Sequence, residues 1–139
     1  MITRMFIYGM LGWSMEILWT GLGSLLLGNW QLISFTYLWM FPIYCTAVFM
    51  EPLHDRISNF RWYFRGLIWA ALIFLIEYTS GGVLCYVLGR CPWDYSGVTP
   101  YSINGFIRLD FAPAWFVVGL LFEKVHLALD RILNKQLAS

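Results

Sequence analysis

The stretch MFIYGMLGWSMEILWTGLGSLLLG, residues 5–28, decides the fold class because it is apolar and long enough to cross a bilayer. A helix needs about 20 apolar residues to span the hydrocarbon core. One carboxylate, Glu16, stands in the middle of this stretch. An ionised carboxylate at bilayer depth costs on the order of 2.5 kcal/mol or more, so it is rarely kept there without a partner or a task. Glu16 is therefore the first candidate functional residue.

Three further apolar stretches complete a chain of four predicted spans. The spans are Met5–Gly28, Ile33–Met50, Gly66–Leu88 and Leu109–Phe122. The last one is expected to continue as a helix past Lys124 to about Leu133. Pro42 and Pro113 lie inside the second and fourth spans, where we expect them to kink the helices.

The composition supports the same class. Only 12% of the 139 residues are charged, against about 25% in soluble domains. The sequence therefore predicts an all-α polytopic membrane protein. It would be a four-transmembrane-helix bundle that forms one membrane domain over residues 1–139.

The positive charges predict the orientation, because lysine and arginine favour cytoplasmic loops. Basic residues precede the first span, separate the second from the third, and follow the fourth: Arg4; Arg56, Arg61 and Arg65; Lys124, Arg131 and Lys135. We therefore expect an integral protein of the cell (inner) membrane with both termini cytoplasmic. The first span lacks a small-residue cleavage site and carries a charge, so we expect it to be retained and not removed as a signal peptide.

The chain also shows the pattern of an internal duplication, with halves of about 1–60 and 61–139. Glu16 and Glu77 are 61 positions apart, and Pro42 and Pro113 are 71 positions apart. The second half therefore has a longer connection between its two spans. Because each half has an even number of spans, both would enter the membrane in the same sense, related by a pseudo-two-fold axis along the membrane normal.

The polar centre of the bundle is predicted around Glu16 and Glu77, with aromatic walls from Trp13, Trp19 and Tyr78. A carboxylate beside an indole attracts an organic cation through its charge and through cation–π interaction. An intramembrane carboxylate can equally carry a proton as part of a relay. The structural alternative is a carboxyl group that hydrogen-bonds to a neighbouring helix and fixes the packing.

The connection between the last two spans carries a second group of candidates. They are Trp93, Asp94, Tyr95, Ser96 and Asn104. One interpretation is a gate over the polar centre. The other, slightly favoured, is a folded interfacial loop in which the first carboxylate locks a turn. We expect Arg108 and Asp110 to join the charge network of this loop.

The three cysteines exclude a full disulfide framework, because their number is odd. A Cys85–Cys91 bridge is one alternative. Buried, packed thiols are the interpretation we favour.

A repeated carboxylate–histidine pattern needs a separate interpretation. The segments Glu51–His54 and Glu123–His126 each place a carboxylate and an imidazole one turn apart. Together with Glu16 and Glu77, these residues are the kinds of ligand that form a four-helix dimetal site. The two segments lie near the cytoplasmic interface, however, whereas Glu16 lies deep. We therefore expect no metal, and we interpret these carboxylates as capping charges that pair with the neighbouring Arg56 and Lys124.

A family resemblance rests on several of these motifs: GWSME at Gly12–Glu16, the helix of Glu77, CPWDYS at Cys91–Ser96, Asn104-Gly105, and the segment from Pro113 to Glu123. With them the chain resembles the CmpB-like family of type IV ABC-transporter proteins over nearly its whole length. The tract Phe35–Glu123 is similar to the vertebrate transmembrane protein 229 group. The resemblance implies a small multi-span membrane protein. Since the sequence has no nucleotide-binding motif, an ABC role would need a separate ATPase subunit.

These features predict a small integral membrane protein that binds or translocates a small cationic or lipid-like ligand at a central intramembrane carboxylate site. One alternative is a non-catalytic subunit or scaffold of a larger membrane complex. Another is a membrane-embedded enzyme that modifies a lipid or isoprenoid with paired carboxylates as acid and base. The expected partners are the bilayer, the small ligand, and a second copy or a membrane complex partner. A net charge of +1 favours no nucleic acid, and we expect no cofactor.

Overall fold

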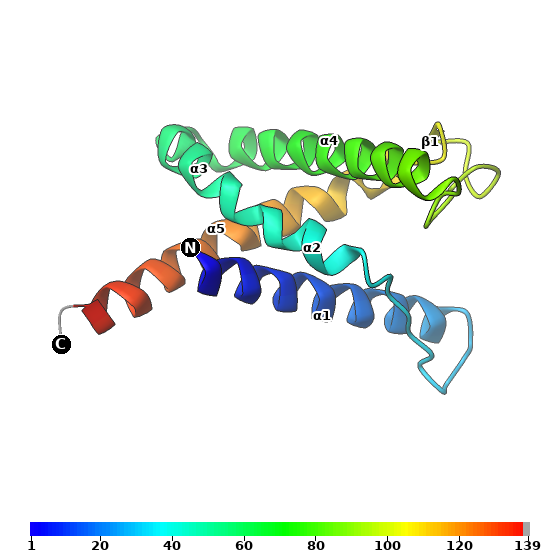
Figure 1. Ribbon diagram of the computed structural model, residues 1–139, viewed down its shortest axis with the longest axis horizontal. Helices are drawn as coiled ribbons and strands as arrows, with labels where there is room; N and C mark the ends of the chain where they lie inside the picture. The colour runs from blue at the N-terminus through cyan, green and yellow to red at the C-terminus, as the bar shows by residue number, and fades with distance from the viewer. Residues whose placement is uncertain (138–139) are drawn as a thin grey trace. The chain divides into compact units, whose positions relative to one another are not determined.

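The computed structural model describes residues 1–137, with the side chains of residues 1–133, and it is mostly helical. Its elements are α1 (Ile2–Leu26), α2 (Met40–Cys45), the 3-10 helix η1 (Thr46–Met50), α3 (Glu51–Ile57), α4 (Trp62–Leu88), strands β1 (Ser102–Ile103) and β2 (Ile107–Arg108), the 3-10 helix η2 (Leu109–Phe111) and α5 (Ala112–Leu137). The chain forms two compact units (Figure 1). Unit 1 is Met1–Leu53, and unit 2 begins at His54, so the boundary falls inside α3.

Unit 1 is a helical hairpin in which α1 packs along α2 and η1 (Figure 1). Two glycines of α1 lie at the contact. A Cβ on Gly12 would overlap the ring of Tyr44, and a Cβ on Gly9 would lie 2.7 Å from Sγ of Cys45. Small residues allow helices to approach closely when lipid provides no hydrophobic drive between them. The glycines of α1 therefore set the spacing of this hairpin.

The predicted second span, Ile33–Met50, is wrong in its first half. Residues 32–37 are not helical, and Leu32 has a left-handed backbone with φ of 52°. The reason lies in α1. The hydroxyl of Thr20 accepts a hydrogen bond from the backbone N–H of Phe35 (3.1 Å) and donates one to its carbonyl (2.9 Å). An α1 side chain therefore satisfies the backbone here, which removes the need for a helical turn.

Both span prolines lie in the first turn of a helix, which corrects the kinks predicted at these positions. Pro42 is the third residue of α2, and Pro113 is the second residue of α5. The first N–H groups of a helix have no intrahelical acceptor, so a proline there loses no hydrogen bond and its fixed φ suits the helix. The two prolines start helices and do not bend them.

Unit 2 is a second hairpin, formed by α4 and α5, which pack side by side. Its best-buried side chain is Trp69, with 0% exposed surface. Two glycines again permit the contact. A Cβ on Gly119 would overlap Cβ of Trp69, and a Cβ on Gly66 would overlap the ring of Phe116. Helix α4 then ends at Gly89, whose φ of 69° is the left-handed conformation that commonly ends helices.

A short β-hairpin connects α4 to α5. Strands β1 and β2 are antiparallel, with Ser102 opposite Arg108 and Ile103 opposite Ile107. The turn is Asn104-Gly105, with φ of 51° and 74°. Positive φ at both central residues is the signature of the two-residue turn that best matches strand twist, and Asn-Gly is its preferred sequence.

Two helical stretches, Trp62–Leu88 and Leu109–Leu133, are long and apolar enough to cross a membrane. Many of their large apolar side chains remain exposed, among them Leu67 (58%), Leu75 (58%) and Val83 (61%). Contiguous exposed apolar surface is typical of a membrane or protein contact. The helix predicted to continue past Lys124 does so, as part of α5. The four-span bundle, the single domain and the orientation stay predictions.

Candidate functional site

Glu16 lies near the middle of α1, where side chains of the following segment converge on it. Oε2 accepts a hydrogen bond from Thr36 Oγ1 (2.9 Å) and another from Tyr44 Oη (3.0 Å). The contact between Thr20 and residue 35 holds the segment that carries Thr36, and the missing side chain of Gly12 admits the Tyr44 ring. The carboxylate is therefore held in a fixed place by two hydroxyl donors, and a carboxylate held this way is suited to accept a cation or a proton.

The two tryptophans predicted beside Glu16 lie differently. The indole Nε1 of Trp13 donates to the carbonyl of Tyr37 (3.3 Å), and its ring meets Phe41 edge-on at 5.9 Å. Trp19 is 55% exposed. Trp13 therefore joins the α1–α2 contact, whereas Trp19 presents much of its ring at the surface of unit 1. The role of both rings as walls of the site stays a prediction.

Glu77 lies in α4, so it belongs to unit 2, whereas Glu16 belongs to unit 1. Its side chain is half-buried, with Oε2 enclosed. Its neighbour Tyr78 points toward the loop: Asn104 Nδ2 donates to Tyr78 Oη (2.8 Å), and the ring meets Phe106 edge-on at 5.5 Å. Two of the predicted residues, Tyr78 and Asn104, thus meet each other in the structure.

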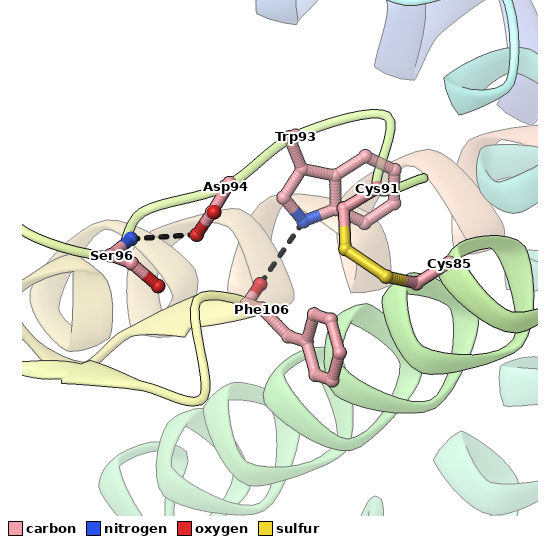
Figure 2. The surroundings of a disulfide bond; sticks show 6 residues. All are labelled: Cys85, Cys91, Trp93, Asp94, Ser96 and Phe106. Atoms are coloured by element: carbon pink, nitrogen blue, oxygen red, sulfur yellow. Dashed lines mark hydrogen bonds between the residues drawn. A yellow bond between two sulfur atoms is a disulfide. The ribbon is translucent and has the colours of Figure 1, made fainter. Parts of the chain in front are cut away.

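The loop after α4 is tightly folded, as Figure 2 shows around Trp93. The buried indole of Trp93 donates from Nε1 to the carbonyl of Phe106 (3.1 Å), and the N–H of Ser96 donates to Oδ1 of Asp94 (2.8 Å) (Figure 2). The N–H of Tyr95 donates to the carbonyl of Gly105 (2.9 Å). Hydrogen bonds from Ser96 hold the pKa of Asp94 below its usual value. These contacts support the interpretation of a folded loop.

The cysteines correct a further prediction. Cys85, in the last turns of α4, is joined to Cys91 by a disulfide bond (Figure 2), so these two residues are not the packed thiols that we favoured. Spacing alone did not decide the point. The turn at Gly89 brings the chain back to the helix end and places the two sulfur atoms together. The third cysteine, Cys45, is a free thiol.

Arg108 and Asp110, which we expected in the charge network of the loop, bind each other. Arg108 donates from Nη2 to Oδ2 (2.6 Å) and from Nε to Oδ1 (3.3 Å) of Asp110. The guanidinium also lies over the ring of Phe111, 4.4 Å from its centre. The pair fixes the end of the loop where it enters η2 and α5.

The sequence analysis missed the most buried ionic cluster of unit 2, which surrounds Glu123. Arg65 binds this carboxylate through two of its three nitrogens, Nε to Oε1 (2.8 Å) and Nη2 to Oε2 (3.0 Å). Trp69 Nε1 also donates to Oε1 (2.8 Å). Arg65 Nη1 also donates to the carbonyls of Ser58 and Phe60. One guanidinium thus joins α4 to α5 and to the turn before α4.

Unit 1 contains a smaller cluster of the same kind around Glu51. Its Oε1 accepts hydrogen bonds from Arg4 Nη1 (3.0 Å) and Tyr8 Oη (2.7 Å). Both carboxylates were expected to pair with the neighbouring Arg56 and Lys124. The described partners are instead far apart in sequence, at the start of the preceding long helix of the same unit. Helix packing brought these partners in, which sequence proximity could not indicate.

A sequence signal for these partners existed. Arg65 lies 61 positions after Arg4, and Trp69 lies 61 positions after Tyr8, which is the offset that relates Glu77 to Glu16. Extending the repeat to these positions would have paired each arginine with the carboxylate of its own half.

The two histidines lie at the same end of unit 2. Both are buried, with 6% of His54 and 4% of His126 exposed, and their ring centres are 5.1 Å apart. His54 Nδ1 lies 3.6 Å from Glu123 Oε1, and His126 Nε2 lies 3.5 Å from Asp130 Oδ2. Within the described part of the chain, no group of three or more His, Cys, Asp or Glu side chains is arranged to hold a metal ion.

Comparison with known families assigns the chain to a group. Residues 3–138 match the family described as "Putative ABC-transporter type IV". The chain belongs to this family. No curated protein and no solved structure matches it. The similarity to the transmembrane protein 229 group therefore stays a prediction, while the transporter-like family and the apolar helices together support a membrane protein.

Proposed function

We propose that this chain is a transporter-like integral membrane protein that binds a small cationic or lipid-like ligand, with Glu16 as its anionic centre. The observation that carries the proposal is the Glu16 carboxylate, placed in mid-helix and held at Oε2 by Thr36 and Tyr44. A carboxylate in an apolar helix is costly to keep, and two hydroxyl donors hold this one in a fixed position. Its retention in an apolar helix, on fixed hydroxyl donors, favours a ligand.

The recurrence of the arrangement supports the proposal. Each unit has a long helix, α1 or α4, that carries an arginine, an aromatic donor and then a glutamate. The offset is 61 positions both between Arg4 and Arg65 and between Glu16 and Glu77. In both, the arginine binds a glutamate of the following helical segment. We therefore include the internal duplication, and Glu77 as second anionic residue, in the proposal.

The family description supports transport over simple binding, and it suggests an energy source. The sequence has no phosphate-binding glycine loop, so ATP hydrolysis would come from a separate subunit. In this proposal the chain forms the membrane part, with both termini in the cytoplasm and the disulfide-bonded loop on the opposite side. Tyr78, Trp93, Tyr95 and Asn104 would close that side.

The test is binding of tetraphenylphosphonium, a lipophilic organic cation, to the full chain in detergent micelles. We expect wild type to bind, and Glu16→Gln to bind at least about tenfold more weakly, because the charge is lost while the amide oxygen still accepts from Thr36 and Tyr44. Tyr44→Phe keeps the charge but loses one donor, so a smaller loss is expected.

The matched control is Asp55→Asn, which removes a carboxylate from an exposed position of unit 2 and should leave the binding of the cation unchanged. Native mass spectrometry of the same variants would reveal a co-purified lipid or small molecule. Equal binding by wild type and Glu16→Gln, with equal adducts, would overturn the proposal and favour the scaffold alternative.

A further inference from the structure

A cluster of ionisable side chains lies in unit 2, where the residues of α3 from His54 onward meet α5. Its centre is the imidazole pair of His54 and His126. Both rings are buried, and histidine is the side chain that ordinarily changes charge between about pH 5 and 8. A buried imidazole pair needs an explanation, because two imidazolium rings 5.1 Å apart would repel each other if nothing balanced their charge.

The surrounding groups supply that balance. Three carboxylates face the pair: Glu123 3.6 Å from His54, and Asp130 and Asp55 at 3.5 and 3.8 Å from His126. One cation, Arg65, is bound to Glu123 on its other side. With neutral imidazoles the cluster therefore has a net charge of −2, which two bound protons would cancel. The other nearby cations in the sequence are exposed: Arg56, Lys124 and Arg131.

The geometry also gives protons an entry. The side chain of Asp55 is 74% exposed and that of Asp130 is 38% exposed, while the side chains of both histidines are at most 8% exposed. Of the three carboxylates, the two beside His126 are the more exposed, since the side chain of Glu123 is 5% exposed. With the last span ending at Phe122, as the sequence predicts, His126 and the cluster would lie just beyond its end, on the aqueous side. The face of the His126 ring is covered by Phe122, which stacks on it at 6.2 Å.

We infer that His54 and His126 form a shared proton-binding site, loaded from solvent past Asp55 and Asp130 and charge-balanced by Glu123. In the loading step a proton leaves a carboxyl oxygen of an aspartic acid and forms an N–H bond at Nε2 of His126. The resulting imidazolium faces the aspartate that released the proton. A proton on His54 faces Glu123, where it competes with Arg65 for the same oxygen, Oε1. This inference does not rest on the proposed ligand binding at Glu16.

The experiment uses the fact that the chain contains two histidines. Histidine-selective isotope labelling of the full chain in micelles gives one imidazole signal set for each, and both are followed from pH 5 to 8. We expect both to titrate, with curves that depart from the single-site form, because interacting sites release protons in shared macroscopic steps. His54→Gln should return the His126 signal to a single-site curve.

Asp55→Asn is the decisive variant, because an exposed position tolerates the change without loss of the fold. Removal of this carboxylate makes imidazolium less favourable, so the His126 curve should move to lower pH, by on the order of half a unit. Asp110→Asn, sixteen positions before His126 on the same helical run, is the control and should move neither curve. Imidazole signals that stay constant from pH 5 to 8, or identical curves for wild type and Asp55→Asn, would overturn the inference.

Discussion

The two carboxylate clusters, Glu51 in unit 1 and Glu123 in unit 2, are built on one plan but differ in burial. Each binds an arginine and an aromatic donor from the start of the preceding long helix. The side chain of Glu51 is 15% exposed and accepts a hydrogen bond from Arg4 Nη1, whereas that of Glu123 is 5% exposed and is bound by Arg65 through Nε and Nη2. The difference teaches that one motif can serve as a partly exposed pair in one unit and as the centre of the core in the other.

The largest effect should come from removing the arginines. Arg65→Gln leaves Glu123 charged and buried without its main partner, which should lower the free energy of unfolding by about 3–5 kcal/mol. Arg4→Gln removes the arginine from a more accessible carboxylate, which water can partly solvate, and should cost about 1–2 kcal/mol. The measurement is unfolding of the full chain by SDS in mixed micelles, followed by tryptophan fluorescence.

Arg61→Gln, at an exposed position one turn before Arg65, is the matched control and should be close to neutral. If Arg65→Gln and Arg4→Gln lowered the free energy of unfolding equally, the difference in burial between the two clusters would not affect their stability.

The glycine contacts extend the comparison to packing. Gly119→Ala places a methyl group against Cβ of Trp69, an atom fixed to the backbone, and should cost about 1–3 kcal/mol. Gly9→Ala meets the ends of the Cys45 and Phe41 side chains, which can move, so we expect a smaller cost. Gly23→Ala faces open space and should stabilise α1 by up to about 1 kcal/mol. The same SDS titration ranks the three, and any other order would show that the helix contacts differ from those described.

The disulfide lies in unit 2, so its removal should lower the stability of that unit. Cys85→Ser with Cys91→Ser removes a constraint on a short loop, worth about 2 kcal/mol in the chain-entropy account. Hydrogen exchange in the loop should accelerate, while exchange in α1 stays constant. The check on the bond itself is alkylation of the unreduced protein: only Cys45 should react, and labelling of Cys85 or Cys91 would contradict the bond.

The smallest effect concerns pH. Because the pKa of Asp94 is lowered in the folded loop, its contribution to stability is present above the usual pKa of aspartate. It is lost as pH falls through the lower folded value, that is, below about pH 4. Exchange of the Ser96 amide should therefore accelerate over that range. Asp94→Asn keeps the acceptor oxygen and should abolish the pH dependence but not the protection. If the exchange rate of the Ser96 amide depended on pH in this variant as in the wild type, the pH dependence would come from another titratable group.

The sequence was a good guide to the long helices and a poor one to their connections. The apolar stretches containing Glu16 and Glu77 became α1 and α4 because nothing in them competes with the helix. The stretch after Gly28 is also apolar, but the hydroxyl of Thr20 binds the backbone N–H and carbonyl of Phe35. The hydrophobic periodicity of the sequence does not indicate such a contact.

For the candidate site the limit was similar. Carboxylates inside long apolar stretches can be recognised in the sequence, and Arg108 and Asp110, two positions apart, were expected in one charge network. Thr36 and Tyr44 as donors to Glu16, and Arg65 and Trp69 as donors to Glu123, depend on how helices pack. The repeat offset would have indicated Arg65 and Trp69, whereas nothing in the pattern indicated Thr36.

The disulfide also has a consequence for how the protein is made. A cystine forms and persists where thiols are oxidised, and cytosolic thiols are kept reduced. Because Cys85 and Cys91 are six residues apart in sequence, the bond needs only the end of α4 and the turn after it, and it can close before α5 is synthesised. The bond would then show that the loop matured in an oxidising compartment. A loop that stayed in a reducing compartment would be recognisable by free thiols at Cys85 and Cys91.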